Sequence, residues 1–249
     1  MSQEEIDLCV CALVNQPIAC PFMDAILQIR GFLLDMDGLL LDTEKVSHRS
    51  WLEAEQETGF QMPAGFHGSL IGQSMVAIGT RLRQVMDPRC DVEAFLKVAE
   101  RIYRSLLKDA PIPLKPGTVD FLEYLCQMNV PRCLATSTHR ELCEQKLAST
   151  GLASLIPLRV CGDDVKHSKP APDIYLEAAS RIGEVPSSLL VLEDSENGIR
   201  AALSAGCQVA HIPDIGPVSL DWQVRTDCVF RSLDDVKAAL ERGEIQVLS

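Results

Sequence analysis

The feature that most constrains the fold is an apolar run that ends in two acidic residues and a glycine, FLLDMDG at residues 32–38. A continuous apolar run of this kind predicts a buried strand of a parallel sheet. Because side chains alternate along a strand, Asp35 and Asp37 are expected on one face at its carboxyl end. Gly38 allows the chain to turn sharply just after them.

Two carboxylates this close to each other repel. At about 4 Å and an effective dielectric constant of about 20, the repulsion costs about 4 kcal/mol. The pair is therefore stable only with a shared proton or a bound cation. A hard divalent ion with oxygen ligands fits best, and we expect Mg²⁺. Taken alone, the pair favours an acidic loop after an edge strand, so the rest of the chain decides.

The composition limits the class of protein. A chain of 249 residues with 47% hydrophobic residues predicts one large domain, or a core with a smaller domain. A net charge of −12 argues against nucleic acid or an anionic membrane as the main partner. The ten cysteines show no zinc-site spacing, and no apolar run reaches membrane-spanning length. We expect a cytoplasmic protein with reduced thiols that is a monomer or a weak homo-oligomer.

Residues 1–30 are expected to form an N-terminal extension in which no chemistry is visible. Glu4, Glu5 and Asp7 stand where a signal peptide would carry basic residues, so export is not expected. Short helices are predicted at residues 6–14 and 25–29, separated by prolines. Met23 is an alternative translation start, which an intact-mass measurement can test.

The segment after the first strand has a helical pattern. Residues 31–43 are predicted to belong to the core, and residues 44–116 to form an inserted helical cap domain, with Thr43 as the N-cap of its first helix. An apolar stripe from Val92 to Leu106 predicts a long helix in this cap. Three prolines between residues 111 and 116 form a stiff connector back to the core.

Residues 117–249 complete the core, because helices and short apolar strands alternate there. Strands are predicted at residues 132–136, 158–161, 189–192, 208–212 and 229–230. This alternation predicts an α/β fold whose core is a doubly wound parallel sheet of the Rossmann-like kind. Ligands of such sheets bind at the carboxyl ends of the strands, near a switch in strand order.

Polar residues follow several of these strands. They are Asp35 and Asp37 after the first strand, Thr136, Ser137 and Thr138 after the second, Lys169 after the third, and Glu193 and Asp194 after the fourth. Acid pairs call for a metal ion, whereas a hydroxyl and an ammonium group call for an anion. A phosphoryl group that bridges the metal and the lysine would satisfy both.

These motifs carry a family resemblance. DMDG at 35–38, the hydroxyl after the second strand, KPAPD at 169–173 and EDSENG at 193–198 occur in the order typical of haloacid dehalogenase-like hydrolases. The chain resembles the helical-cap subgroup over residues 31–249. Within it, the likeness is to phosphorylated-carbohydrate phosphatases and beta-phosphoglucomutase-like proteins.

The resemblance implies a role for each site residue. Asp35 would be the nucleophile that forms an aspartyl-phosphate, and Asp37 the general acid and base. Thr136 and Ser137 would bind phosphoryl oxygens, and Lys169 would offset the negative charge at the nucleophile and the phosphoryl group.

The resemblance also implies the ligands of Mg²⁺. An oxygen of Asp35, the backbone carbonyl of Asp37, and the Glu193-Asp194 pair would hold the ion. Whether Glu193 binds Mg²⁺ directly or instead contacts the residues that bind it is left open.

Three functions follow from the resemblance. The favoured one is a Mg²⁺-dependent phosphatase of a small phosphate monoester, such as a phosphorylated sugar or polyol. The alternatives are a phosphosugar mutase and a non-enzymatic phosphosugar-binding protein. An intact Asp37 argues against a mere binder. Ser47 stands where the mutase pattern has a histidine, and Met75 follows the turn 72–74 where that pattern has an arginine, which argues against the mutase.

Overall fold

A parallel sheet of six strands forms the centre of the protein. The computed structural model describes residues 26–63, 65–70, 75–87, 90–109, 112–216 and 218–248. The strand order is β4-β3-β2-β5-β6-β7, and every neighbouring pair is parallel. The strands are β2 (Gly31–Leu34), β3 (Arg132–Ala135), β4 (Leu158–Val160), β5 (Leu189–Glu193), β6 (Gln208–His211) and β7 (Cys228–Val229).

Helices cover both faces of this sheet. On β2, Phe32 and Leu34 pack into one hydrophobic cluster, and Leu33 packs into the other. The first cluster includes residues of α5 (Thr118–Gln127), α6 (Arg140–Thr150) and α10 (Leu233–Glu241), and the second includes residues of α7 (Asp173–Ile182) and α8 (Glu196–Ala205). Shorter helices are η2 (Leu152–Ser154), η3 (Gly162–Asp164), η4 (Pro186–Ser188) and α9 (Leu220–Gln223). The predicted doubly wound core is confirmed.

The switch in strand order lies at β2. From β2 the chain first builds outward through β3 and β4, and later returns to β5 on the other side of β2 before it continues to β6 and β7. Leu34 is in register with Leu134 of β3 and with Leu192 of β5. The residues that follow these three strands therefore meet at one edge of the sheet, which is where a ligand is expected.

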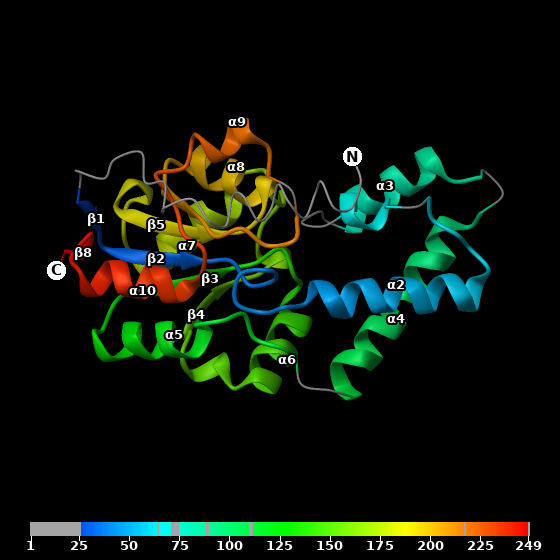
Figure 1. Cartoon of the computed structure of the whole chain (residues 1–249), viewed down its shortest axis with the longest axis horizontal. Helices are drawn as coiled ribbons and strands as arrows, with labels where there is room; N and C mark the ends of the chain where they lie inside the picture. The colour runs from blue at the N-terminus through cyan, green and yellow to red at the C-terminus, as the bar shows by residue number, and fades with distance from the viewer. Residues whose placement is uncertain are drawn as a thin grey trace.

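Three helices form a layer of their own beyond that edge (Figure 1). They are α2 (Glu44–Thr58), α3 (Met75–Val85) and α4 (Val92–Asp109), with the short η1 (His67–Leu70) between the first two. Their buried side chains make a separate hydrophobic cluster, in which Phe60 stacks on Phe95 at 4.1 Å between ring centroids. This layer corresponds to the predicted cap, whose exact limits at residues 44 and 116 stay a prediction. None of the described helices is long and apolar enough to cross a membrane.

The helix predicted at residues 25–29 is wrong. Leu27–Ile29 forms strand β1, which pairs in parallel with β8 (Ile245–Val247) near the other end of the chain. Five residues are too few to stabilise an isolated helix, whereas pairing buries Ile29 completely. The helix predicted at 6–14, Met23 and the turn at 72–74 lie outside the described residues.

Candidate active site

The loop after β2 carries two of the predicted acids. The backbone N–H of Asp35 donates to the carbonyl of Leu192, which ties the end of β2 to β5. Gly38 has a φ of +92°, and a Cβ atom there would lie 2.2 Å from Oδ2 of Asp194. A side chain at this position is therefore excluded, and the acids that follow β2 and β5 come close together.

Lys169 lies buried between two carboxylates. Its Nζ donates to Oδ1 of Asp35 at 2.5 Å, to Oε1 of Glu193 at 2.7 Å and to the carbonyl of Ala135 at 2.9 Å. Burial acts to lower the pKa of the ammonium group, but the charges of Asp35 and Glu193 outweigh it and the pKa is raised. Lys169 is therefore a permanent positive charge at the centre of the site.

Glu193 has hydrogen-bond donors on both oxygens. Besides Lys169, its Oε1 accepts from the hydroxyl of Tyr175 at 2.7 Å, and its Oε2 accepts from the backbone N–H groups of Asp194 and Ser195 at 3.0 Å. Gly198 makes room for the carboxyl group, because a Cβ atom there would be 1.7 Å from Oε1. The side chain is thus held in one position, with the charge of Lys169 against it.

Asp194, unlike Glu193, has a carboxylate oxygen without a hydrogen-bond donor in the described structure. Its Oδ1 is buried and makes no hydrogen bond within the described structure, and the same holds for Oδ2 of Asp214 in the loop after β6. Burial, followed by the charge of Glu193, raises the pKa of Asp194 well above its ordinary value. Burial likewise raises the pKa of Asp35 to about 7, although Lys169 opposes the shift. The site therefore holds more buried carboxylate than its lysine can neutralise.

This donor set fits Mg²⁺. Hard oxygen ligands suit the ion, and a divalent cation would satisfy the orphaned oxygen of Asp194 and offset its repulsion with Asp35. No three His, Cys, Asp or Glu side chains among the described residues form a ready metal cluster. Two carboxylates with a backbone carbonyl, and water for the remaining positions, are the set that these residues offer.

Asp37 is held by three donors from three segments. Its Oδ1 accepts from Thr43 Oγ1 at 2.8 Å and from Lys146 Nζ at 2.6 Å, and its Oδ2 accepts from Thr138 Oγ1 at 2.7 Å. Burial acts to raise the pKa of Asp37, but the charge of Lys146 and these hydrogen bonds outweigh it, so the pKa is lowered.

The structure corrects the expected cap at the start of α2. Thr43 occupies the N-cap position, but its side chain makes no capping hydrogen bond, because the hydroxyl donates to Asp37 instead. Thr43 therefore connects the predicted acid–base residue to the first cap helix.

The loop after β3 reaches the site through Thr138, which was expected at this edge of the sheet but was given no role of its own. Thr136 is buried, and its Oγ1 accepts from the backbone N–H of Thr138 at 3.1 Å. Thr138 in turn contacts Asp37, whereas Ser137 is exposed. Lys146 was missed because it follows from no motif. Asp214 and Tyr175 were missed for the same reason.

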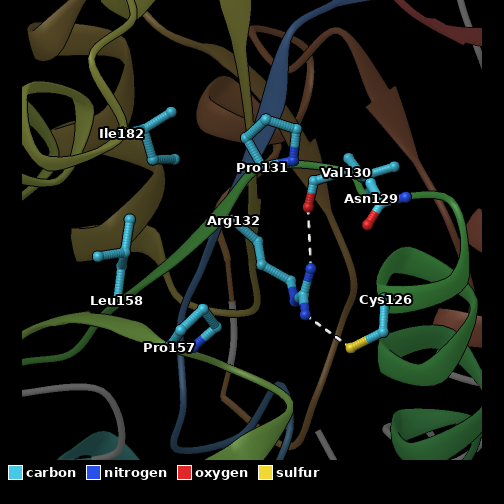
Figure 2. A pocket seen from close by; sticks show the side chains of 8 residues that line it. All are labelled: Cys126, Asn129, Val130, Pro131, Arg132, Pro157, Leu158 and Ile182. Carbon is cyan, nitrogen blue, oxygen red and sulfur yellow. Dashed lines mark hydrogen bonds between the residues drawn. The ribbon is translucent and has the colours of Figure 1, made fainter.

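A pocket of about 280 Å³ lies at the opposite edge of the sheet (Figure 2). Arg132 and Leu158, the first residues of β3 and β4, line it. The guanidinium of Arg132 donates to the carbonyl of Val130 at 2.9 Å and to Sγ of Cys126 at 2.6 Å. None of the predicted site residues lines this pocket.

The chain belongs to the haloacid dehalogenase-like hydrolases, because the model of that family matches residues 29–206. It is 29% identical to a phosphorylated carbohydrates phosphatase of Thermotoga maritima over 88% of this chain and 94% of the relative. It is 32% identical to a fructose-1-phosphate phosphatase of Escherichia coli over 73% of this chain and 95% of the relative. The predicted family and the predicted enzyme class, a hydrolase of phosphoric monoesters, are confirmed.

The fold also resembles a solved beta-phosphoglucomutase. The crystal structure of that enzyme from Clostridium difficile matches with a TM-score of 0.70 and 20% identity, over 87% of this chain and 97% of that one. At this identity the likeness concerns the fold alone, and it agrees with the Rossmann-like core and its helical layer.

Proposed function

We propose that the protein is a Mg²⁺-dependent phosphatase that hydrolyses a small phosphorylated sugar or polyol through an aspartyl-phosphate on Asp35. The observation that carries this proposal is the buried Lys169 bridging Asp35 and Glu193, with a second, independently held carboxyl group on Asp37. The named activities of the two curated relatives support the substrate class.

In the first step, an oxygen of Asp35 attacks phosphorus and the bond to the leaving alcohol breaks. The leaving oxygen takes a proton from Asp37, which is protonated for this step. Lys169 lies against Oδ1 of Asp35 and offsets the negative charge that gathers around it. Thr136 and Ser137, with backbone N–H groups of the same loop, would hold the phosphoryl oxygens.

In the second step, Asp37 accepts a proton from water while the water oxygen attacks phosphorus. The bond between phosphorus and Asp35 breaks, which restores the carboxylate and releases inorganic phosphate. The carboxylate form that this step needs is the form that Lys146, Thr43 and Thr138 favour in the structure.

The metal would be held by Asp35, Asp194 and the backbone carbonyl of Asp37, and when bound it would supply charge neutralisation for the phosphoryl oxygens. Of the two alternatives for Glu193, we infer that it does not bind the metal directly but lies behind the residues that do. Both of its oxygens are occupied by donors, and Lys169 is its ion-pair partner. Its role would be to orient Lys169.

Mg²⁺ should stabilise the protein more near pH 8 than near pH 5. The folded-state pKa of Asp35 is about 7 against an ordinary 3.8, so the metal-free native state binds more protons than the unfolded state between these values. The contribution of Asp35 to the free energy of unfolding is then fully present below about pH 3.8 and is lost as the pH rises through about 7. At about ten times its Kd, Mg²⁺ should contribute about 1.4 kcal/mol, or about 3–5 °C in Tm.

Thermal unfolding with and without Mg²⁺ measures this effect. Asp194→Asn should remove the shift, because the amide is a poor ligand for the ion. Glu193→Gln should keep it, because we place Glu193 behind the ligands. An equal Mg²⁺ shift in the Asp194→Asn variant and the wild type would contradict this metal site.

Beta-glucose 1-phosphate should yield inorganic phosphate with little glucose 6-phosphate. A mutase must hold a second phosphate, and a cation has to be available for it. Four lysines are instead each paired with a carboxylate: Lys45, Lys115, Lys146 and Lys169. Ser47, which replaces the mutase histidine, accepts a hydrogen bond from the indole of a cap tryptophan at 3.2 Å. The side chain of Met75 is not among those that the structure describes.

A phosphorus NMR time course with a trace of the bisphosphate tests this prediction, and Mg²⁺ is present throughout. Dominant conversion to glucose 6-phosphate would favour the mutase instead. A panel with fructose 1-phosphate and glycerol phosphate then narrows the substrate. No turnover of any member would favour the non-enzymatic binder.

We also infer that the protein works in the cytoplasm. In support, none of the seven cysteines that the structure describes forms a disulfide, as expected in a reducing compartment. A monomer or weak homo-oligomer stays a prediction, which light scattering can test.

A further inference from the structure

Lys146 of α6 is a buried lysine outside the predicted motifs. Its side chain is only 3% exposed, and the helix around it packs into the core through Cys143 and Leu147. Lysine is almost never fully buried unless it is paired. Here its partner is Asp37, with Nζ 2.6 Å from Oδ1.

The same ammonium group reaches the helical cap. Its Nζ lies 5.4 Å from the centroid of the Tyr103 ring on α4, which is within the range of a cation–π interaction. Lys146 thereby connects the carboxyl group that follows β2 to a cap helix from a different part of the chain.

Lys146 is the charged member of the group that holds Asp37. Thr43 and Thr138 each donate a hydrogen bond from a hydroxyl group, which can rotate and can also accept a hydrogen bond. An ammonium group can only donate, and it brings a full charge to Oδ1. Three donors on two oxygens leave the carboxylate one orientation, and Lys146 contributes the strongest of the three contacts.

We propose that Lys146 is a positioning residue that orients the Asp37 carboxyl group for its proton transfers and ties it to the cap through Tyr103. The inference rests on the proposed function, because it assumes that Asp37 transfers protons.

A purely structural role explains this lysine less well. Taking two charges out of water costs free energy, and an apolar side chain of similar volume often stabilises such a position as well or better. Asp37 also keeps 27% of its side chain exposed, so it is accessible to a substrate and to water. The pair therefore fixes a reactive group rather than filling the core.

Lys146→Met is the test, combined with Asp37→Asn in a double-mutant cycle. With glycerol phosphate, whose alkoxide must be protonated, the single variant Lys146→Met should lower kcat about 10²-fold. In the Asp37→Asn background, adding Lys146→Met should change kcat less than about twofold, because the lysine acts through the carboxyl group that is already gone.

A second substrate separates positioning from general damage. With p-nitrophenyl phosphate the leaving group departs without a proton, so its first turnover in Lys146→Met should stay within about threefold of the wild type. Later turnovers should be slow, because water still needs Asp37, and a burst of nitrophenolate should appear. Lys146→Arg, which keeps the charge, should recover part of the lost activity.

Lys97→Met is the matched control, because Lys97 is exposed on α4, and it should behave as the wild type. Circular dichroism checks the fold, and Lys146→Gln replaces the methionine variant in the cycle if that variant unfolds. Equal losses from the lysine substitution with and without Asp37, or an equal loss in both first turnovers, would overturn the inference. Full activity of Asp37→Asn alone would instead remove the proposed function.

Discussion

Asp35→Asn should abolish turnover and leave the fold intact. The amide keeps the shape of the side chain and can still accept from Lys169, which also keeps its bond to Glu193. It cannot attack phosphorus, so we expect a loss on the order of 10⁴-fold or more. At neutral pH the variant should be at least as stable as the wild type, because a buried carboxyl group with a pKa raised to about 7 is replaced by a neutral one.

Phosphate release measures the loss of activity, and mass spectrometry of acid-quenched protein detects the intermediate. The wild type should gain the mass of one phosphoryl group during turnover, whereas Asp35→Asn should not. Asp91→Asn is the matched control: Asp91 caps α4 through the N–H of Ala94, and asparagine caps equally well. Activity of Asp35→Asn within tenfold of the wild type, in protein free of contaminating phosphatase, would rule out Asp35 as the nucleophile.

Lys169→Met should cost both stability and activity. It leaves Asp35 and Glu193 buried without their shared cation, and breaking a buried pair in this way costs about 3–5 kcal/mol. Turnover should fall about 10²–10³-fold, because the positive charge beside the reacting carboxylate is lost.

Urea denaturation and steady-state kinetics test the two effects separately. Tyr175→Phe is the matched control, because it removes a single hydrogen bond to Oε1 of Glu193 and leaves the lysine in place. It should cost about 1.5–3 kcal/mol and change kcat by less than about tenfold. If the free energy of unfolding of Lys169→Met lay within about 1 kcal/mol of the wild-type value, the ion-pair network would not stabilise the fold as its burial indicates.

The central strands were predictable because each is a short, continuous apolar run. The strands predicted at 132–136 and 189–192 form Arg132–Ala135 and Leu189–Glu193. Burial on both faces leaves such a run few alternatives to a parallel strand. By contrast, β1 and β8 have three residues each, and their pairing joins the two ends of the described chain. No local pattern predicts a partner more than two hundred residues away.

The sequence by itself determined at which edge of the sheet the candidate site residues meet. Asp35, Thr136, Lys169 and Asp194 follow successive core strands, and in a parallel sheet those ends meet. The face predicted to be shared by Asp35 and Asp37 does not follow from strand alternation, because β2 ends at Leu34 and both acids lie in the loop after it.

Only the tertiary structure decided which groups these residues contact. Lys146 and Tyr175 come from helices, and Asp214 comes from a distant loop, so their approach depends on how each element packs against the sheet. The same packing turned Glu193 toward Lys169 and left an oxygen of Asp194 without a hydrogen-bond partner in the described structure. Local sequence patterns predict the face that an element buries, whereas the partner of a single side chain is set by contacts between elements far apart in the chain.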